Sequence, residues 1–249
     1  ILTTVGDLMI WNEALTDGRL GGPEFVRMMH EERGRLSNGT EIVSETYPYE
    51  TGNQIWGSPA SADMDLDGVI DYVIASKDKS VYLLDQNGFK GSADLETFLL
   101  GTPTIGNIDD DDELELIVGG YSSSGEKIYA LNHDLTPVNG FPIEIDEKIK
   151  MGVSLADFNG NGREDIVFGT NDDNIYLLLD DGTIAEGFPF QAGNKIHSSP
   201  AILDLDGELV ILAGSNDDFL YAINSDGSLR FSVQASNAVE GSPSFLNFM

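Results

Sequence analysis

The chain of 249 residues contains no cysteine and few basic residues. Its 13 Lys and Arg stand against 43 Asp and Glu, which gives a formal net charge of −30 and a pI near 4.1. The lack of cysteine excludes disulfide scaffolds, thiolate zinc sites, thiol nucleophiles and iron–sulfur clusters. The shortage of basic residues argues against nucleic acid and anionic membranes as partners, because both select a basic protein face.

Long apolar segments are also missing from the sequence. No run of about 18 apolar residues occurs, so we expect no membrane insertion. Hydrophobic residues still make up 41% of the chain, which is enough to bury a core. No stretch shows sustained helical periodicity, and Gly, Asp and Asn interrupt the chain too often for long helices. The sequence therefore predicts an all-β fold.

The sequence repeats itself. Four similar segments begin at Gly57, Gly101, Gly152 and Ser198, and a fifth opens at Gly241. An acid or amide anchors each copy, and neighbouring anchors lie between 43 and 50 residues apart: Asp63, Asn107, Asp157, Asp204 and Asn247. A period in the mid-forties with four strands per copy is typical of β-propeller blades.

Each copy has the same predicted order of strands. In the first copy, a short strand over 58–62 leads into an acidic turn, and an apolar strand follows over 71–76. An alternating strand over 81–85 comes next, and Gly88 precedes a fourth, weaker strand. Equivalents of the alternating strand are expected at 128–132, 175–179 and 220–224.

The length and period predict a single β-propeller over residues 1–249, with five four-stranded blades. We expect a degenerate blade over 1–56 and regular blades over 57–100, 101–150, 151–197 and 198–240. The segment 241–249 is predicted to close the ring by pairing with the N-terminal blade, which removes an exposed strand edge. A fragment of a larger ring is the alternative. Because the chain begins at Ile1, we expect a mature chain or part of a longer one, monomeric as a domain.

Three acidic loops, 63–71, 107–115 and 157–165, offer oxygen ligands at positions 1, 3, 5 and 9. A glycine at position 6 in the first and third loops permits a sharp turn, and the main-chain carbonyl at position 7 can add a ligand. A hard cation such as Ca²⁺ takes six to eight oxygen ligands, so the spacing predicts about three calcium sites. The candidate ligands are Asp63, Asp65, Asp67, Val69 and Asp71; Asn107, Asp109, Asp111, Glu113 and Glu115; and Asp157, Asn159, Asn161, Arg163 and Asp165.

Two other interpretations of these loops need to be compared with calcium binding. An EF-hand requires a bidentate Glu at position 12, but the three loops have Ile74, Val118 and Phe168 there, so that interpretation fails. Asp, Asn and Gly also form turns without any metal. The same spacing in three loops favours calcium. The fourth loop, 204–208, is about two residues shorter and lacks the closing carboxylate, so we expect no calcium there.

These motifs resemble a known family. The Gly-Ser-Pro and Gly-Thr-Pro openings, the D-x-D-x-D-G-x-x-D loop and the VYLLD strand are similar to FG-GAP/VCBS repeats, the blades of integrin-alpha-like propellers and of many secreted microbial proteins. The resemblance covers residues 45–249 well and 1–44 poorly. It implies a propeller in which the loops just described hold calcium in a mainly structural role, and it is unspecific for activity.

No catalytic constellation is visible in the sequence. His30, His133 and His197 lie at non-equivalent repeat positions, and no G-x-S-x-G motif is present. We therefore expect a non-catalytic module that binds a protein or glycan partner in an extracellular or cell-surface setting. The alternative is a carbohydrate-active enzyme, such as a polysaccharide lyase or glycosidase, or the accessory domain of one. The acidity alone would also suit a high-salt environment.

Aromatic side chains offer a further candidate ligand surface. They can stack on sugars or anchor a partner, but those at matched repeat positions are expected to pack between blades instead. The candidates are Trp11, Tyr47, Tyr49, Trp56, Tyr121, Phe188 and Phe190.

Overall fold

The structure is a computed structural model that describes residues 49–122, 126–205 and 207–244. The chain divides into two compact units, Ile1–Tyr49 and Glu50–Met249, and every described strand lies in the second unit. The described residues form strands, turns and loops, and none of them forms a helix. This part of the chain accordingly has no helix that could cross a membrane.

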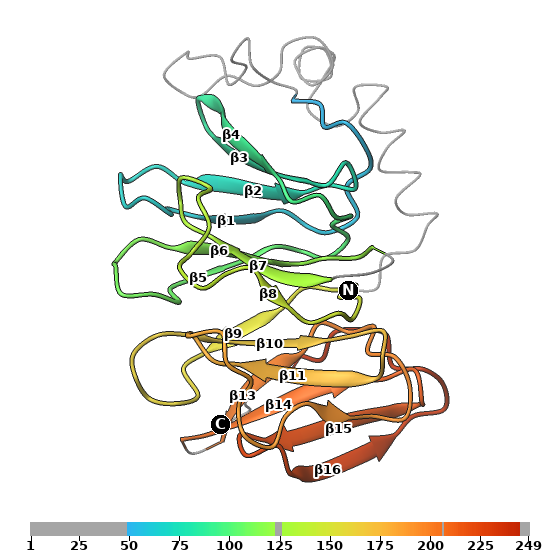
Figure 1. Cartoon of the computed structure of the whole chain (residues 1–249). Helices are drawn as coiled ribbons and strands as arrows, with labels where there is room; N and C mark the ends of the chain where they lie inside the picture. The colour runs from blue at the N-terminus through green and yellow to red at the C-terminus, as the bar shows by residue number, and fades with distance from the viewer. Residues whose placement is uncertain (1–48, 123–125, 206, 245–249) are drawn as a thin grey trace, which may run out of the picture. The chain divides into compact units, whose positions relative to one another are not determined.

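The strands form four separate four-stranded antiparallel sheets, each built from consecutive strands (Figure 1). The first sheet contains β1 (Ala60–Ala62), β2 (Asp71–Ala75), β3 (Ser80–Asp85) and β4 (Gly88–Asp94). The second contains β5 (Thr104–Gly106), β6 (Glu115–Gly119), β7 (Lys127–Leu131) and β8 (Ile143–Glu144). The third contains β9 (Ser154–Ala156), β10 (Asp165–Gly169), β11 (Asn174–Leu178) and β12 (Phe190–Gln191). The fourth contains β13 (Ala201–Leu205), β14 (Glu208–Gly214), β15 (Phe219–Asn224) and β16 (Leu229–Gln234).

Strand character follows from the sequence of each segment. The second strands β6 and β10 are buried at every position, which explains their continuous apolar runs rather than alternation. β1 begins at Ala60 rather than at Ser58 as predicted, because Pro59 has no N–H to give to a ladder. The fourth strands vary more than predicted: β8 and β12 have two residues each, whereas β4 and β16 have seven and six.

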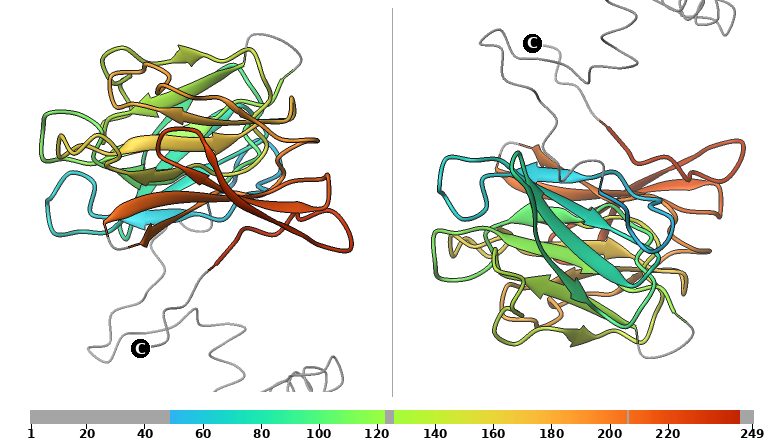
Figure 2. Two further views of the ribbon diagram at one scale, coloured as in Figure 1. Left: turned by 90° about the horizontal axis from the view of Figure 1, so that it is seen from below. Right: turned by 90° about the horizontal axis from the view of Figure 1, so that it is seen from above.

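The core lies between successive sheets. Val73 and Val81 of the first sheet share an apolar cluster with Leu116 and Val118 of the second. A second cluster joins the second and third sheets, and a third joins the third and fourth. The first strands of neighbouring sheets contact one another, β1 with β5, β5 with β9 and β9 with β13. In both views of Figure 2 the sheets pack face to face, as propeller blades do.

The antiparallel order places two kinds of connection at opposite edges of the sheets. The loops between first and second strands, which include the three acidic loops, lie at one edge, on the left of Figure 1. The turns between second and third strands lie at the other edge, together with the connections that lead into the next sheet. We refer to these as the acidic-loop edge and the opposite edge.

The all-β class and the propeller architecture predicted from the sequence are confirmed. The number of blades stays a prediction. Most of the expected degenerate blade, 1–56, falls outside the described residues, and its described part, 49–56, contains no strand. Of the expected closing segment 241–249, residues 241–244 form no strand and the rest fall outside the described residues.

Candidate metal sites

In all three acidic loops the carboxylate at position 9 is buried and holds the loop closed. Its residue begins the second strand of its sheet and is at most 1% exposed: Asp71, Glu115 and Asp165. One oxygen accepts the main-chain N–H of the residue at position 2. These bonds run from Met64 to Asp71 Oδ2 (3.1 Å), from Ile108 to Glu115 Oε2 (2.7 Å) and from Phe158 to Asp165 Oδ2 (2.8 Å). The second carboxylate oxygen is left for another partner.

The turn inside the first and third loops depends on glycine. Gly68 and Gly162 have φ values of 86° and 91°, a conformation that side chains with a Cβ adopt at a cost. The N–H of Gly68 donates to Asp63 Oδ2 at 2.9 Å, and the N–H of Gly162 donates to Asp157 Oδ2 at 2.8 Å. The N–H of the glycine at position 6 thus holds one oxygen of the position-1 carboxylate against the backbone.

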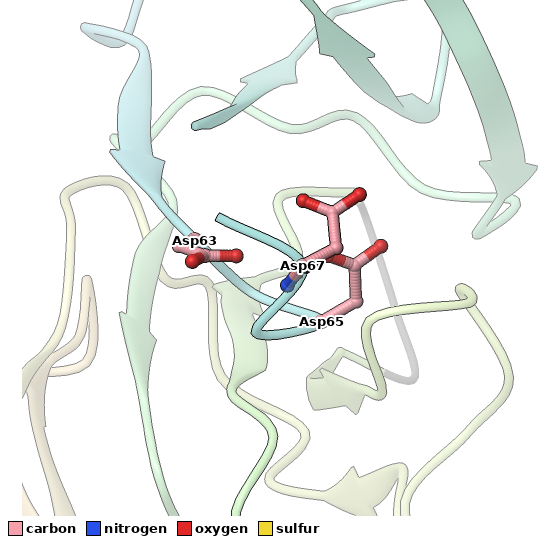
Figure 3. A group of neighbouring side chains, drawn as sticks. All are labelled: Asp63, Asp65 and Asp67. Carbon is pink, nitrogen blue, oxygen red and sulfur yellow. Dashed lines mark hydrogen bonds between the residues drawn. The ribbon is translucent and has the colours of Figure 1, made fainter. Parts of the chain in front are cut away.

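Three carboxylates of the first loop converge. Oxygen atoms of Asp63, Asp65 and Asp67 all lie within 4.8 Å of one another (Figure 3). Oδ1 of Asp63 is buried and has no hydrogen-bond partner among the residues that the structure describes. A buried carboxylate oxygen without a partner is costly, and a cation held in the loop would remove that cost.

A lysine from another strand already neutralises part of this cluster. Lys90, on β4, places its Nζ 2.9 Å from Asp65 Oδ2 and 2.7 Å from Asp71 Oδ1. Burial lowers the pKa of Lys90, but the hydrogen bonds to Asp71 and Asp65 outweigh it and raise the pKa above its ordinary value. The hydrogen bond from Lys90 in turn lowers the pKa of Asp65. The lysine therefore stays charged and binds two of the predicted ligands.

The second loop collects negative charge without such a partner. Oxygen atoms of Asp109, Asp111 and Glu115 lie within 4.8 Å of one another. Among the described residues, no Lys or Arg nitrogen lies within 4 Å of these three carboxylates. Burial, reinforced by the charges of Asp109, Asp111 and Glu113, raises the pKa of Glu115 to about 7. The second loop is therefore short of positive charge.

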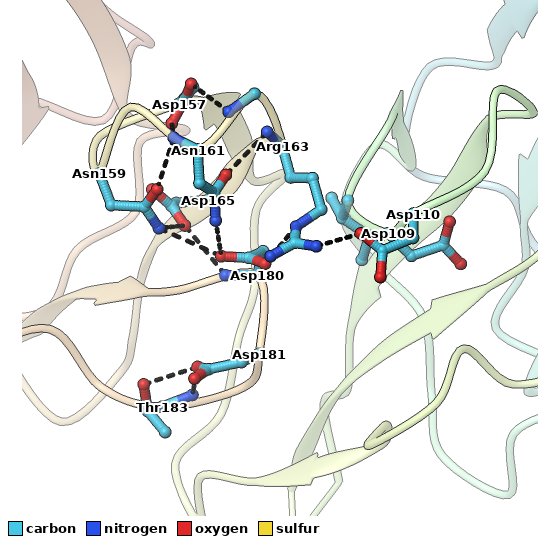
Figure 4. A network of polar contacts seen from close by, with 12 residues as sticks. Asp109, Asp110, Asp157, Asn159, Asn161, Arg163, Asp165, Asp180, Asp181 and Thr183 are labelled. Atoms are coloured by element: carbon cyan, nitrogen blue, oxygen red, sulfur yellow. Dashed lines mark hydrogen bonds and ion pairs between the residues drawn. The ribbon is translucent and has the colours of Figure 1, made fainter.

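In the third loop, hydrogen bonds hold the predicted ligands (Figure 4). Three main-chain N–H groups donate to Asp157, the strongest from Gly162, and lower its pKa. The side-chain amides of Asn159 and Asn161 donate to Asp180 Oδ1 at 3.1 and 2.9 Å. The oxygens of these two amides accept in turn, Asn159 Oδ1 from the Asn161 N–H at 3.0 Å and Asn161 Oδ1 from the Arg163 N–H at 2.8 Å.

The Arg163 side chain joins the third loop to its neighbours. Its Nε lies 2.6 Å from Asp180 Oδ2, and its Nη1 pairs with Asp110 of the second loop. Glu164 adds two bonds between the same loops, because its N–H donates to the Asn107 carbonyl (2.9 Å) and its Oε2 accepts the Asn107 N–H (3.1 Å). The N–H of Leu114 likewise donates to the Met64 carbonyl at 2.9 Å. The three loops therefore form one connected row along the acidic-loop edge.

The fourth loop is a tight hairpin. Leu205 of β13 pairs directly with Glu208 of β14, which leaves no room for a ligand-bearing loop. Glu208 pairs with Arg230 of β16 at 3.0 Å. Between this hairpin and the third loop lies an open polar cavity of about 680 Å³, whose lining includes Asp157, Asp226 and Arg230.

The sequence did not reveal three contributors to these sites: Lys90, Asp180 and the Arg163 guanidinium. Each reaches its partner from 17 to 53 residues away, through the pairing of third and fourth strands or through the packing of neighbouring sheets. One indication of such contacts was present in the sequence. Basic residues are scarce, so each of them is a candidate partner for a carboxylate cluster. The first and second loops, with three converging carboxylates each, are the two places where the described residues could hold a metal ion.

The matched aromatic pair packs as expected from its repeat position. Phe188 and Phe190 lie against the apolar cluster between the third and fourth sheets. Trp56 is 58% exposed, with the Lys77 ammonium 4.4 Å from the centre of its ring.

Comparison with known proteins supports the fold. No family model matches the chain, and no curated protein matches its sequence. Among solved structures, BBS1N, determined in complex with ARL6DN, is similar with a TM-score of 0.59 and 17% identity, over 75% of this chain and 58% of BBS1N. BamB from Moraxella catarrhalis is similar with a TM-score of 0.54 and 18% identity, over 76% of this chain and 55% of BamB.

The biofilm matrix protein Bap1 of V. cholerae is a third similar structure. Its TM-score is 0.53 at 22% identity, over 71% of this chain and 28% of Bap1. BBS1N and BamB are propeller-like, and at these identities the likeness concerns the fold alone. The chain spans less than two thirds of each of these structures.

Proposed function

We propose that this chain is a calcium-stabilised, non-catalytic β-propeller of the FG-GAP/VCBS type that serves as an extracellular or cell-surface binding module for a protein. The observation that carries the proposal is the second loop, where three carboxylates converge with no cation from the described residues to balance them. The repeated closure of all three loops by a buried position-9 carboxylate supports a common, built geometry.

Calcium is the metal that best suits the donors. The first and second loops offer carboxylate and main-chain carbonyl oxygens and contain no histidine or cysteine, the ligands that zinc prefers. Mg²⁺ demands near-ideal octahedral geometry, whereas Ca²⁺ accepts six to eight oxygens in a flexible arrangement. In the first loop Asp63, Asp65 and Asp67 would bind the ion with the Val69 carbonyl, and in the second Asp109, Asp111 and Glu115 would do so with the Glu113 carbonyl.

A structural role for the metal follows from the connected loops. The N–H of Leu114, in the second loop, binds the Met64 carbonyl of the first. An ion that fixes one loop therefore also steadies the joint between two blades. Millimolar extracellular calcium suits sites of this kind, since their affinity is typically modest.

The proposal of a protein partner draws on the propeller likeness. BBS1N was solved in a complex with ARL6DN, and Bap1 is a biofilm matrix protein, so similar folds serve in protein binding and in a matrix. A glycan partner is the second possibility for such a module. Both are proposals for this chain, which spans only part of either protein.

The chemistry of the polar cavity beside the third loop supports a non-catalytic role. A glycosidase needs one protonated carboxyl group beside an ionised one. In the cavity next to the third loop, hydrogen bonds lower the pKa of Asp157 and of Asp226, through main-chain N–H groups and Ser228 respectively. Both carboxylates are thereby kept ionised, and neither suits a general acid. We expect no release of sugars from acidic or neutral polysaccharides.

Counting bound ions tests the proposal. Equilibrium dialysis of chelator-treated protein against ⁴⁵Ca²⁺ should show saturable binding, and Glu115→Gln should lower the number of bound ions by one, the ion of the second loop. A matched variant, Glu113→Gln, keeps the main-chain carbonyl and should bind as the wild type does. Excess Mg²⁺ should displace little of the calcium. Absence of saturable binding up to about 10 mM Ca²⁺ would refute the proposal, because even weak extracellular sites saturate there.

A further inference from the structure

The positive side chains of this acidic protein are unevenly placed. The described residues include nine Lys and Arg. Four of them lie within 4 Å of a carboxylate oxygen: Lys90, Lys127, Arg163 and Arg230. The other five have no carboxylate partner at that distance in the part of the chain that the structure describes: Lys77, Lys79, Lys148, Lys150 and Lys195.

All five of these lysines lie at the opposite edge, away from the acidic loops. Lys77 and Lys79 belong to the turn between β2 and β3, and the other three belong to the connections that lead into β9 and β13. Main-chain bonds hold these connections against the neighbouring turns, since the N–H of Asn171 donates to the Lys148 carbonyl and that of Asn216 to the Lys195 carbonyl, each at 2.9 Å. The lysine backbones are thus fixed by the sheets.

Three blades bring a connected polar cluster together at this edge. Lys150 Nζ lies 3.3 Å from His197 Nδ1, and His197 Nε2 lies 2.8 Å from Asn171 Oδ1. The Asn171 amide donates to Tyr121 Oη at 3.2 Å, and Lys148 Nζ lies 5.5 Å from the centre of the Tyr121 ring. We call Tyr121, Lys148, Lys150, Asn171 and His197 the lysine cluster.

The hydrogen bonds of the lysine cluster leave donors facing outward. Because Asn171 Oδ1 only accepts, His197 Nε2 carries the proton and Nδ1 presents its lone pair to Lys150. Tyr121 Oη accepts the Asn171 amide, so its own O–H can donate, and no described residue accepts from it. A ligand that meets the two ammonium groups and this hydroxyl must therefore supply acceptors.

Charged neighbours act on the His197 ring. Burial lowers the pKa of His197, and the charges of Lys150 and Lys195 lower it further, while Glu240 acts against them. Glu240 Oε1 lies 3.6 Å from His197 Nδ1, and its side chain is 62% exposed, so solvent screens it. The cluster thus gathers two ammonium groups on a protein whose net charge is −30.

We propose that the lysine cluster binds a single carboxylate group, carried by a small organic acid or by one acidic side chain of a protein partner. A carboxylate offers acceptors only, and its hydrogen bonds to ammonium groups are stronger than those between neutral groups. Polyanions are excluded by the net charge of the whole chain, whose repulsion acts on every charge beyond the cluster. The site lies at the edge opposite to the acidic loops, so its test does not depend on the metal.

Titrations at constant ionic strength test this site. The probes are sodium acetate and a capped Gly-Glu-Gly peptide, with sodium chloride as the reference, and the readout is the NMR signal of the His197 ring. We expect saturable shifts and a rise in the pKa of His197, because the bound carboxylate offsets the charge of Lys150. Lys150→Met should weaken binding by about tenfold, since hydrogen bonds to charged groups typically contribute that much.

Lys79→Met is the matched control, because Lys79 lies at the same edge but outside the cluster. It should bind both probes as the wild type does. Saturation by either probe supports the site, and the probe that saturates identifies the source of the carboxylate. Shifts that do not saturate, that chloride reproduces or that persist unchanged in Lys150→Met would overturn the proposal. Circular dichroism of each variant confirms that it is folded, so a lost signal reports binding.

Discussion

One oxygen of Glu115 accepts the main-chain N–H of Ile108, and the other has no hydrogen-bond partner among the described residues. Its neighbours Asp109 and Asp111 add charge instead of relieving it, which helps to hold the pKa of Glu115 near 7. At the scale of single residues, this imbalance is the strongest indication that the second loop could hold a cation. The corresponding acids Asp71 and Asp165 have donors on both oxygens.

Replacing Glu115 tests that reasoning directly. Glu115→Gln should remove the calcium-dependent part of the stability that the second loop contributes, because the variant loses a charged ligand. With calcium at about 100 times the dissociation constant, that part is about 2.7 kcal/mol. Chemical denaturation with and without calcium measures it. Glu113→Gln should retain the full effect, and equal losses in both variants would contradict the assigned roles.

Lys90 should compete with the metal of the first loop, since its ammonium binds Asp65 and Asp71. Lys90→Met should destabilise the metal-free protein by about 1–3 kcal/mol, because Oδ1 of the buried Asp71 then loses the partner it has in Lys90. The same variant should bind calcium more tightly at the first loop. Chemical denaturation in EDTA measures the stability and calorimetric titration measures the calcium affinity, each with Lys79→Met as control. A weaker calcium affinity in Lys90→Met would show that the lysine supports the site instead.

His197 should make stability depend on pH. Burial and Lys150 lower its pKa below the ordinary 6.5, so the unfolded chain binds more protons than the folded chain below that pH. Stability should therefore fall as the pH drops below about 6.5. His197→Gln should remove this slope. Denaturation at pH 7 and 5.5 measures this change in the free energy of unfolding. Saturating calcium is present because a bound ion would keep Glu115 from titrating in this range. An unchanged slope in the variant would assign the dependence to other groups.

At the scale of strands and loops, the glycines that open the repeats allow neighbouring blades to approach closely. Gly57 and Gly101 open their repeats, and a Cβ on either would lie 2.5 or 2.4 Å from the main-chain carbonyl oxygen of the next blade, that of Gly101 or Met151. Such a contact cannot be relieved by a side-chain rotation. The glycines at positions 57 and 101 therefore mark close approaches between neighbouring blades, in addition to turn signals.

Gly101→Ala should destabilise the protein by about 1–3 kcal/mol, the usual cost of overpacking. Gly241 opens the fifth repeat copy, and a Cβ there would meet no atom of the described residues within 4 Å. Gly241→Ala is thus a matched control from the same motif, and its stability should stay within about 0.5 kcal/mol of wild type. Thermal melts of both variants compare the two positions. Equal losses would show that the glycine matters for the turn alone.

The sequence was sufficient to predict elements whose information is local. Alternation and glycine spacing located the third strands to within one residue, and the spacing of the loop acids located the two carboxylate clusters that could hold a metal ion. It could not predict that Asn159 and Asn161 donate their amides to Asp180, because that contact depends on how the β11–β12 connection folds back. For the same reason, the sequence could not predict that a lysine balances the first loop and not the second. Lys90 lies on another strand, β4, and contacts the first loop only in the folded chain.

At the scale of the whole molecule, two groups of charged residues are separated in the described sheets. The acidic loops are connected in a row at one edge, and the lysines without carboxylate partners lie at the other. Two bound Ca²⁺ ions would offset about four of the −30 charges, so calcium accounts for the clustering of acids more than for their number. The rest of the acidity keeps the surface strongly hydrated and repels polyanions.

Thermal unfolding of the wild-type protein in calcium and in EDTA tests the central claim most directly. The metal-free loops carry unbalanced carboxylates, so calcium should raise the melting temperature, and the rise should grow with calcium concentration as expected for a ligand of the native state. Magnesium at equal concentration should have a much smaller effect. A melting temperature that is the same in EDTA and in about 10 mM calcium would contradict a calcium-stabilised propeller.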